Sequence, residues 1–183
     1  MGELKSAWEI AQEKAKKLGD LSAEEREKQR EKECLQIAKA LADKYLAHPD
    51  ARLLTSELAR YDGQEKELIT RFLLRQFVDT IDIRFSTSTE HAMQGILNLN
   101  HDNAVTETLN RIKELLQEYQ VAEARQKEDI ENAGREILHQ MRISGSAVSR
   151  INPQARDEWQ KKLETVAQPF AETLKKLKQR LPG

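Results

Sequence analysis

Glycine, proline, cysteine and aromatic residues are all scarce in this chain. Its 183 residues include seven glycines, four prolines and nine aromatic residues, a composition typical of long helices with wide solvated faces. Cys34 is the only cysteine, which excludes an intramolecular disulfide. No uninterrupted apolar run approaches the roughly 18 residues of a membrane-spanning helix, and the first residues lack the apolar segment of a signal peptide. These absences predict a cytoplasmic protein that does not enter a membrane.

Charged residues are what the chain has in abundance. They make up 33% of the sequence and apolar residues 38%, against typical values of about 25% and about 45–50%. The two signs nearly cancel to a net charge of −1, so the whole molecule attracts nucleic acid or an anionic membrane only weakly. A chain of this length can bury a single core. Composition and length together predict one all-α domain over residues 1–183.

The stretch from Glu65 to Phe85 is predicted to be the central helix of that domain. At about 100° per residue, its apolar side chains cover most of the helical circumference. The polar side chains form a narrow seam of Arg71, Arg75, Asp79 and Asp82. Because a helix that is apolar nearly all round is buried among neighbours, we expect the other helices to pack around this one.

A helix is also predicted before the central stretch. Ser22 and Glu25 fit a capping box, and the helix that they start should run to about Leu46. Its first half, EEREKQREKE, is interpreted as a solvated face, with a partner-binding charge patch as the alternative. Its second half is expected to pack through Leu35, Ala38, Leu41, Ala42 and Tyr45.

Two short helices should flank the central stretch. Asp50 can cap the first, and Thr87 with Glu90 forms a second capping box for the other. Gly95 lies inside this second short helix, where glycine costs up to about 1 kcal/mol relative to alanine. Close approach of a neighbouring helix is one reason for a glycine there, and a weak helix is the other.

The first residues predict a peripheral helix over residues 3–18. Its seam is thin and rich in alanine, and Gly19 is well placed to end it. The segment GELKSAWEIA from Gly2 to Ala11, followed by KKLGDLS from Lys16, resembles the start of an uncharacterised bacterial family of helical proteins. This resemblance covers roughly the first 20 residues, and it implies a bacterial protein without implying a function.

Residues 104–141 contain no proline and one glycine, Gly134, and should form one amphipathic helix of about 35 residues that Asn103 caps. Its apolar positions follow heptad spacing, which the polar residues Glu123 and Gln126 interrupt. The positions before the interruption are Val105, Leu109, Ile112, Leu116 and Tyr119, and those after it are Ile130, Ala133, Ile137 and Met141. A straight helix of this length spans about 57 Å, whereas a compact chain of this size has a radius of gyration of about 16 Å. The helix therefore either projects from the body or bends.

The long helix also suggests an oligomeric state. If it stays continuous, its overhanging apolar stripe would face water, which soluble monomers rarely tolerate over a large patch. A second copy is the simplest cover, so we predict a homodimer with coiled-coil character. The alternative is that residues 104–119 pack on the chain's own central helix and that the chain bends afterwards.

A last helix is predicted after a loop over residues 143–152. Asn152 can cap it, and Pro153 fits its first position. Pro169 should kink it. Its apolar stripe consists of Trp159, Leu163, Val166, Phe170, Leu174, Leu177 and Leu181.

Glu136 and His139 are the only pair in the sequence whose spacing is found in catalytic sites of helical bundles. Residues three apart on a helix place a carboxylate and an imidazole on the same face. A di-iron bundle site needs a second such pair and two further glutamates, and no other histidine has a glutamate three residues earlier. We interpret His139 as a solvent-facing residue near a helix C-terminus.

The loop Ser144–Ser146, with Arg142, Arg150 and Arg156 nearby in sequence, is a weak candidate for anion binding. A plain turn with capping serines is the preferred interpretation, since the spacing is not that of a Walker motif. Cys34 is interpreted as a small core residue. The basic run from Lys175 to Arg180 complements a helix dipole and has no interleaved aromatic residues for binding single-stranded nucleic acid.

No motif in the sequence identifies a reaction. We therefore predict no catalytic residue, cofactor or metal, and we expect a non-enzymatic helical scaffold or adaptor with a protein partner. The alternative is a helical-bundle binding protein or enzyme that binds a metal or an anion through Glu136 and His139 or through the Ser144–Ser146 loop.

Overall fold

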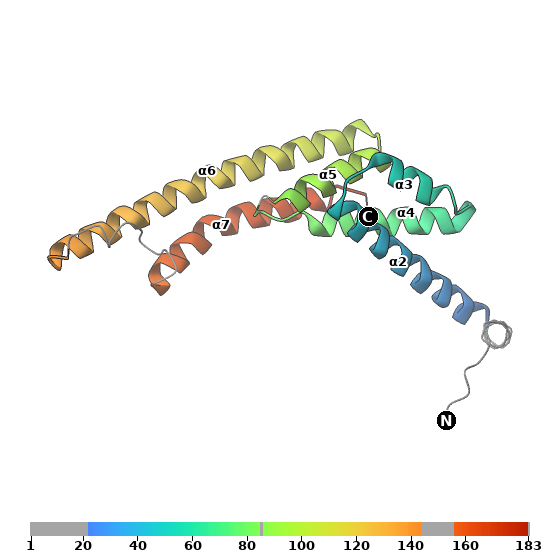
Figure 1. Cartoon of the computed structure of the whole chain (residues 1–183), viewed down its shortest axis with the longest axis horizontal. Coiled ribbons are helices and arrows are strands. Elements are labelled where there is room, and N and C mark those ends of the chain that lie inside the picture. Colours follow the sequence, from blue (N-terminus) through green and yellow to red (C-terminus); the bar gives the residue numbers. More distant parts are fainter. Residues whose placement is uncertain (1–21, 85, 144–155, 183) are drawn as a thin grey trace, which may run out of the picture.

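The structure is a computed structural model that describes residues 22–84, 86–143 and 156–182. All regular structure within those residues is helical, and it forms an elongated bundle (Figure 1). The predicted helix over 3–18, Phe85, Asn152 and Pro153 lie outside the described residues. The described helices are α2 (Ala23–Ala47), α3 (Ala51–Leu58), α4 (Gly63–Thr80), α5 (Thr87–Leu99), α6 (Asn103–Gln140) and α7 (Asp157–Lys178).

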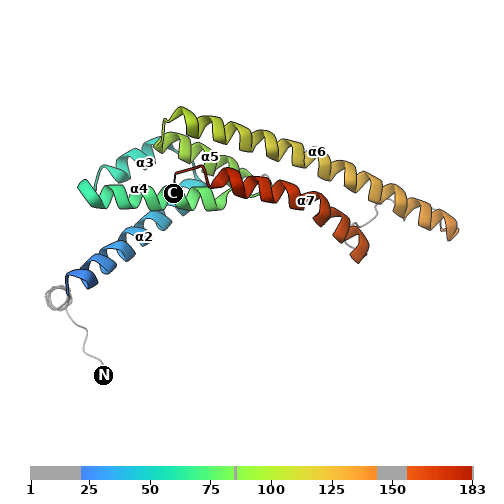
Figure 2. The same ribbon diagram turned by 180° about the vertical axis from the view of Figure 1, so that it is seen from behind.

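The bundle consists of a body and an arm. Helices α2 to α5, the first half of α6 and the last part of α7 share one apolar core, which is the body. Beyond the body, α6 runs outward and α7 returns beside it (Figures 1 and 2). We call residues 120–140 of α6 and 157–170 of α7 the arm. The first half of α2 leaves the body on the side away from the arm.

Helix α4 is the centre of the body, as the sequence predicts. Its Ile69, Leu73 and Phe77 are fully buried, and α2, α3 and α5 pack against it. The ring of Phe77 lies 5.3 Å from the ring of Tyr45 on α2, in a tilted arrangement that aromatic pairs favour. The four residues of the polar seam are all exposed, which confirms the predicted orientation of the helix.

The central helix is shorter than predicted, because it ends at Thr80 rather than near Phe85. Ile81 takes an extended conformation with φ −67° and ψ 120°. The Asp82 side chain accepts a hydrogen bond from the backbone N–H of Arg84, and this local bond stabilises a turn in place of further helix. Ile81 is nevertheless buried. The apolar pattern was therefore right about burial here and wrong about the backbone.

Gly95 brings α5 close to α4. A Cβ atom at this position would lie 2.7 Å from Cε2 and 2.9 Å from Cζ of Phe77, which is too close for carbon atoms in contact. The Phe77 ring therefore packs directly against the backbone of α5. Of the two reasons considered for a glycine in this helix, close approach is the one confirmed.

Helix α2 buries a stripe that differs from the predicted one at its start. Leu35 was expected to pack and is instead 42% exposed. Its neighbour Cys34 is buried, and the side chains of adjacent helical residues point about 100° apart, so the buried stripe begins at Cys34 rather than at Leu35. The buried residues of α2 are Cys34, Ala38, Leu41, Ala42 and Tyr45.

The capping box at the start of α2 is confirmed. The Ser22 hydroxyl accepts from the backbone N–H of Glu25 at 3.2 Å, and the Glu25 carboxylate accepts from the N–H of Ser22 at 2.8 Å. The hydrogen bond from the backbone N–H of Ser22, and after it the interaction with the Ser22 side chain, lower the pKa of the Glu25 carboxyl. Asp50 also caps α3 as predicted, by accepting from the N–H of Arg52 at 2.9 Å.

Two other predicted caps are wrong by one residue. Ser86 caps α5 in place of Thr87, and Asp102 caps α6 in place of Asn103. Several neighbouring residues in each segment have side chains able to cap, so composition alone did not select between them.

The ends of two body helices are held by side chains from distant helices. The Nδ1 atom of His91 on α5 lies 2.7 Å from the carbonyl oxygen of Leu46 near the end of α2. The Nζ atom of Lys178 on α7 donates to the carbonyl oxygens of Asp79 and Ile81 at the end of α4. The last carbonyls of a helix have no partner inside it. In a chain with few glycines, these donors supply what a left-handed glycine cap would otherwise arrange.

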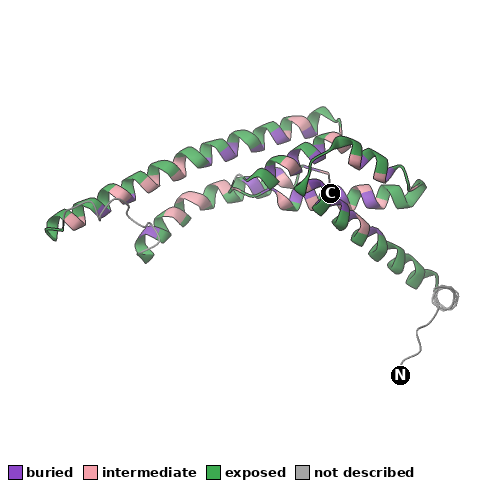
Figure 3. Ribbon diagram, viewed as in Figure 1, coloured by how far each residue is buried: buried purple, intermediate pink, exposed green. Residues whose placement is uncertain are grey.

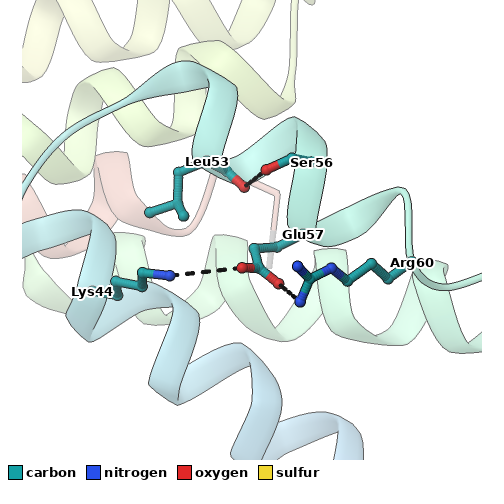
Figure 4. A network of polar contacts seen from close by, with 5 residues as sticks. All are labelled: Lys44, Leu53, Ser56, Glu57 and Arg60. Carbon is teal, nitrogen blue, oxygen red and sulfur yellow. Dashed lines mark hydrogen bonds and ion pairs between the residues drawn. The ribbon is translucent and has the colours of Figure 1, made fainter.

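Ion pairs join α3 to its neighbours on the surface of the body. One oxygen of the Glu57 carboxylate lies 2.8 Å from Arg60, and the other lies 3.6 Å from Lys44 on α2 (Figure 4). The Ser56 hydroxyl donates to the carbonyl oxygen of Leu53 in the same helix. Exposed pairs of this kind contribute at most about 1 kcal/mol each, so apolar packing is the main source of stability.

The long helix is confirmed: α6 is a continuous helix of 38 residues. Of the two alternatives that the sequence left open, it projects from the body (Figure 1). Most of its apolar stripe does not face water, because α7 lies along it. The ring of Tyr119 lies 5.5 Å from the ring of Phe170 at the root of the arm. In the arm, Ile130 and Gly134 of α6 and Trp159 of α7 are buried, and Figure 3 shows residues of intermediate burial along both helices.

The buried stripe of α6 departs from heptad spacing in the arm. Ile130 is buried as predicted, but Ala133 is exposed and Gly134 is buried in its place. A straight helix turns once in 3.6 residues, so a strict heptad drifts off the contact face over several turns. Met141, the last predicted position, is 62% exposed. The stripe therefore follows a straight helix paired with α7.

Candidate interaction surface

A groove of about 990 Å³ opens where the end of α4 meets the end of α7. Its lining includes the apolar side chains of Val78, Ile81, Leu174 and Leu181, which belong to the edge of the core. The turn after α4 forms one wall, so the groove exists because that helix ends at Thr80. The charged residues of the lining are Arg75, Asp79, Asp82, Arg84, Lys175 and Lys178.

Among the charged residues of the groove, Lys178 is held by hydrogen bonds to two backbone carbonyls. Its Nζ atom lies 3.3 Å from the carbonyl oxygen of Asp79 and 3.0 Å from that of Ile81. Burial lowers the pKa of this ammonium, while the carboxylates of Asp79 and Asp82 act in the opposite direction. Lys178 is therefore a structural cation that fixes the end of α7 on the end of α4.

The remaining cations of the groove are not paired. In the part of the chain that the structure describes, Arg75, Arg84 and Lys175 form no ion pair with a carboxylate. Four basic and two acidic side chains line the groove, which gives it a formal charge of +2, whereas the whole chain carries −1. The groove is thus a local positive site with an apolar component.

The end of the arm presents apolar side chains to solvent. Met141 is 62% exposed and Ile143 is 45% exposed. Between them Arg142 has φ 57°, a left-handed conformation that glycine usually adopts. The backbone N–H of Arg142 donates to the carbonyl oxygen of His139, and the backbone N–H of Ile143 donates to the carbonyl oxygen of Leu138. This is the hydrogen-bond pattern of a Schellman motif. This motif fixes the direction of the chain after α6.

Glu136 and His139 both lie on the exposed surface of α6. The Glu136 carboxylate accepts a hydrogen bond from Gln140 at 3.2 Å, and no hydrogen bond or ion pair joins it to His139. Within residues 22–84, 86–143 and 156–182, no group of three or more His, Cys, Asp or Glu side chains is arranged to hold a metal ion. The structure therefore does not bring further ligands to this pair.

The other residues that the sequence singled out lie in separate parts of the chain. The Ser144–Ser146 loop and Arg150 lie outside the described residues. The guanidinium of Arg156 lies 5.3 Å from the ring of Trp159, where it makes a cation–π contact. Cys34 is buried as predicted, and burial raises the pKa of its thiol. The basic run does lie in the last turn of α7, where it complements the helix dipole.

Comparisons with known proteins add no relative. No protein-family model, curated protein or solved structure matches the chain. Among the helices that the structure describes, none combines the length and the apolar character needed to cross a membrane. The function of the chain is therefore inferred from its surfaces.

Sequence reasoning missed the groove. Arg75, Asp79 and Asp82 were identified as a polar seam, and Lys175 and Lys178 as a basic helix end. These segments are about a hundred residues apart, and neither contains a signal for the other. One local feature could have indicated this side of the groove. The central helix ends after Thr80, and the Asp82 side chain stabilises a turn there.

Proposed function

We propose that the chain is a non-enzymatic helical scaffold or adaptor that acts through protein–protein interaction. The observation that carries this proposal is the arm. Its two helices meet along a thin apolar seam, with Ile130 and Trp159 buried, while most of the remaining arm surface is exposed. Paired helices that leave the body add surface rather than core, and accessible surface is what a scaffold offers to partners.

Exposed apolar side chains on this surface support the proposal. Val121 is 53% exposed on the arm, and Met141 and Ile143 are exposed where α6 ends. Methionine adapts to irregular partner surfaces because its side chain is unbranched and polarizable. We infer that these side chains contribute to binding, with the charged residues around them forming a polar rim.

Affinity capture with matched variants tests the proposal. Wild-type protein should retain specific partners, and the Val121→Glu/Met141→Glu variant should lose them, because a charge in an apolar contact must be desolvated. Leu35→Glu/Leu97→Glu is the control, since both leucines are exposed on the body. The proposal fails if wild type and the arm variant capture the same proteins in the same amounts.

We also propose that one partner is a second copy of the chain. The original reason, an uncovered stripe on α6, no longer holds, because α7 covers it. Self-association would instead use the exposed arm residues named above. Light scattering should give about twice the monomer mass of 21.1 kDa for wild type, and the monomer mass for Val121→Glu/Met141→Glu. A monomer mass for wild type throughout the micromolar range would refute the dimer.

The proposed compartment is the cytoplasm. Its support is the single cysteine, Cys34, which is a free thiol in the core. Reduced thiols are maintained in the cytosol, whereas secreted domains commonly pair their cysteines.

A further inference from the structure

We propose that the groove between α4 and α7 binds an acidic, amphipathic segment of a partner protein. This inference rests on the proposed adaptor function and assigns to it one binding site and one class of partner. The groove lies at the root of the arm, beside the contact between Tyr119 and Phe170. A partner bound there would touch both the body and α7.

The distribution of charge selects the sign of the ligand. The two carboxylates of the groove, Asp79 and Asp82, interact with Lys178, which is itself held by backbone carbonyls. Arg75, Arg84 and Lys175 form no ion pair with a carboxylate of the described residues. Carboxylates on a partner would complement these three cations and would also direct the encounter.

The shape and the apolar lining select a peptide segment over a small anion. The volume of about 990 Å³ is at the upper end of the range for ligand pockets, and it accommodates several side chains. Ile83 is partly exposed beside the buried Leu174 and Leu181, so the lining offers apolar contact between the cations. An amphipathic segment satisfies both features, with apolar side chains inward and acidic ones toward the rim.

Nucleic acid fits the same groove less well. Among the described residues that line it, none has an aromatic side chain on which a base could stack. Asp79 and Asp82 would also face the phosphates of a bound strand and repel them. An acidic protein segment can place single carboxylates near the cations and avoid these two positions.

Peptide binding tests the proposal directly. The probe is a fluorescein-labelled peptide of two heptads with leucines at the a and d positions and glutamates elsewhere. Two comparison peptides keep its length: one replaces every glutamate by lysine, and the other replaces every leucine by serine. Fluorescence anisotropy should show saturable, salt-sensitive binding of the first peptide, weaker binding of the serine peptide and none of the lysine peptide.

Protein variants locate the binding. Arg75→Glu/Lys175→Glu should weaken the affinity for the acidic leucine peptide by about tenfold or more, because it reverses two of the three unpaired charges. Lys39→Glu/Lys113→Glu is the matched control, since it makes the same change in charge at exposed mid-helix positions outside the groove. Circular dichroism would verify that both variants keep wild-type helicity. Absence of binding to wild type, or equal losses in the two variants, would overturn the proposal.

The same variants separate this inference from the adaptor function. If Arg75→Glu/Lys175→Glu still captures the partners of the wild type, the groove is not their site and the adaptor function stands. If the peptide binds in the groove but the wild type captures no partner through its arm, the groove stands and the arm-based adaptor function fails.

Discussion

The Nζ atom of Lys178 lies 3.0 Å from the carbonyl oxygen of Ile81, although the two residues are 97 positions apart in the chain. This contact joins the end of the last helix to the end of the central helix. The terminal carbonyls of a helix carry partial negative charge and lack partners within the helix, so a cation is suited to this place. The hydrogen bond therefore closes the body and also forms one side of the groove.

Replacing Lys178 by methionine should lower the free energy of unfolding by about 1–2 kcal/mol. The change removes a charged donor from two carbonyls, and partial exposure to water reduces the loss. Lys176→Met is the matched control, because Lys176 is exposed on the same turn of α7. Urea denaturation followed by circular dichroism measures both. Equal effects of the two substitutions would show that the contact contributes nothing.

Gly95→Ala should destabilise the protein even though alanine is the better helix former. The added Cβ would lie 2.7 Å from the Phe77 ring, and overpacking of this kind costs about 1–3 kcal/mol. Phe77→Leu in the same chain should make the alanine less harmful, because the smaller side chain leaves room. Thermal melts of the two single variants and the double variant measure this coupling. Strictly additive effects would contradict the proposed contact.

Leu73→Ala should cost about 2–5 kcal/mol, because Leu73 is fully buried at the centre of the body and its truncation leaves a cavity. Leu35→Ala makes the same chemical change at a side chain that is 42% exposed, and it should change stability by less than about 0.5 kcal/mol. Denaturant midpoints decide between the two positions. If Leu73→Ala lowered the free energy of unfolding as little as Leu35→Ala, α4 would not be the central helix of the body.

Ile130→Ser should loosen the arm and leave the body folded. Ile130 is buried in the arm and lies outside the main core cluster, so its removal should promote local rather than global opening. Hydrogen exchange should accelerate over residues 120–140 and 157–170, while α4 and α5 keep their protection. Acceleration of similar size in α4 would mean that arm and body unfold as one cooperative unit.

The stability of the protein should fall in alkaline solution partly through Tyr45. Burial raises the pKa of its hydroxyl above the usual 10.0, although the hydrogen bond from Asn98 acts in the opposite direction. Because the folded state then holds this proton more tightly than the unfolded state, the stabilisation is complete below pH 10 and is lost as pH rises through the folded pKa. Melting temperatures should therefore fall less steeply above about pH 10 for Tyr45→Phe. Parallel curves would contradict this assignment.

The sequence was sufficient to predict the helices and most of their buried faces. The buried residues of α2 from Ala38 onward and those of the first half of α6 agree with the predicted stripes. This agreement follows from local physics, since the helical period and the pattern of apolar residues are both properties of a short segment. The Ser22 capping box was predictable for the same reason, because both of its partners lie within one turn.

The errors arose where a single residue or a distant segment decided the outcome. The turn at Asp82 and the contact of Lys178 both lie at the end of α4, and the shift from Ala133 to Gly134 lies where α6 is paired with α7. The prediction that a second copy must cover α6 was wrong, because α7 covers most of the stripe. Periodicity reveals an apolar stripe but does not reveal which helix will cover it.

The sequence by itself determined that this chain is all-helical, most of the residues that its helices bury and where several of the helices begin. Only the tertiary structure decided that α7 covers the arm of α6 and that the ends of α4 and α7 enclose a groove with three unpaired cations. The physical reason is the range of the interactions. Propensity, periodicity and capping act within a few residues, whereas pairing of helices depends on how whole faces fit and on contacts such as that of Lys178 with Ile81.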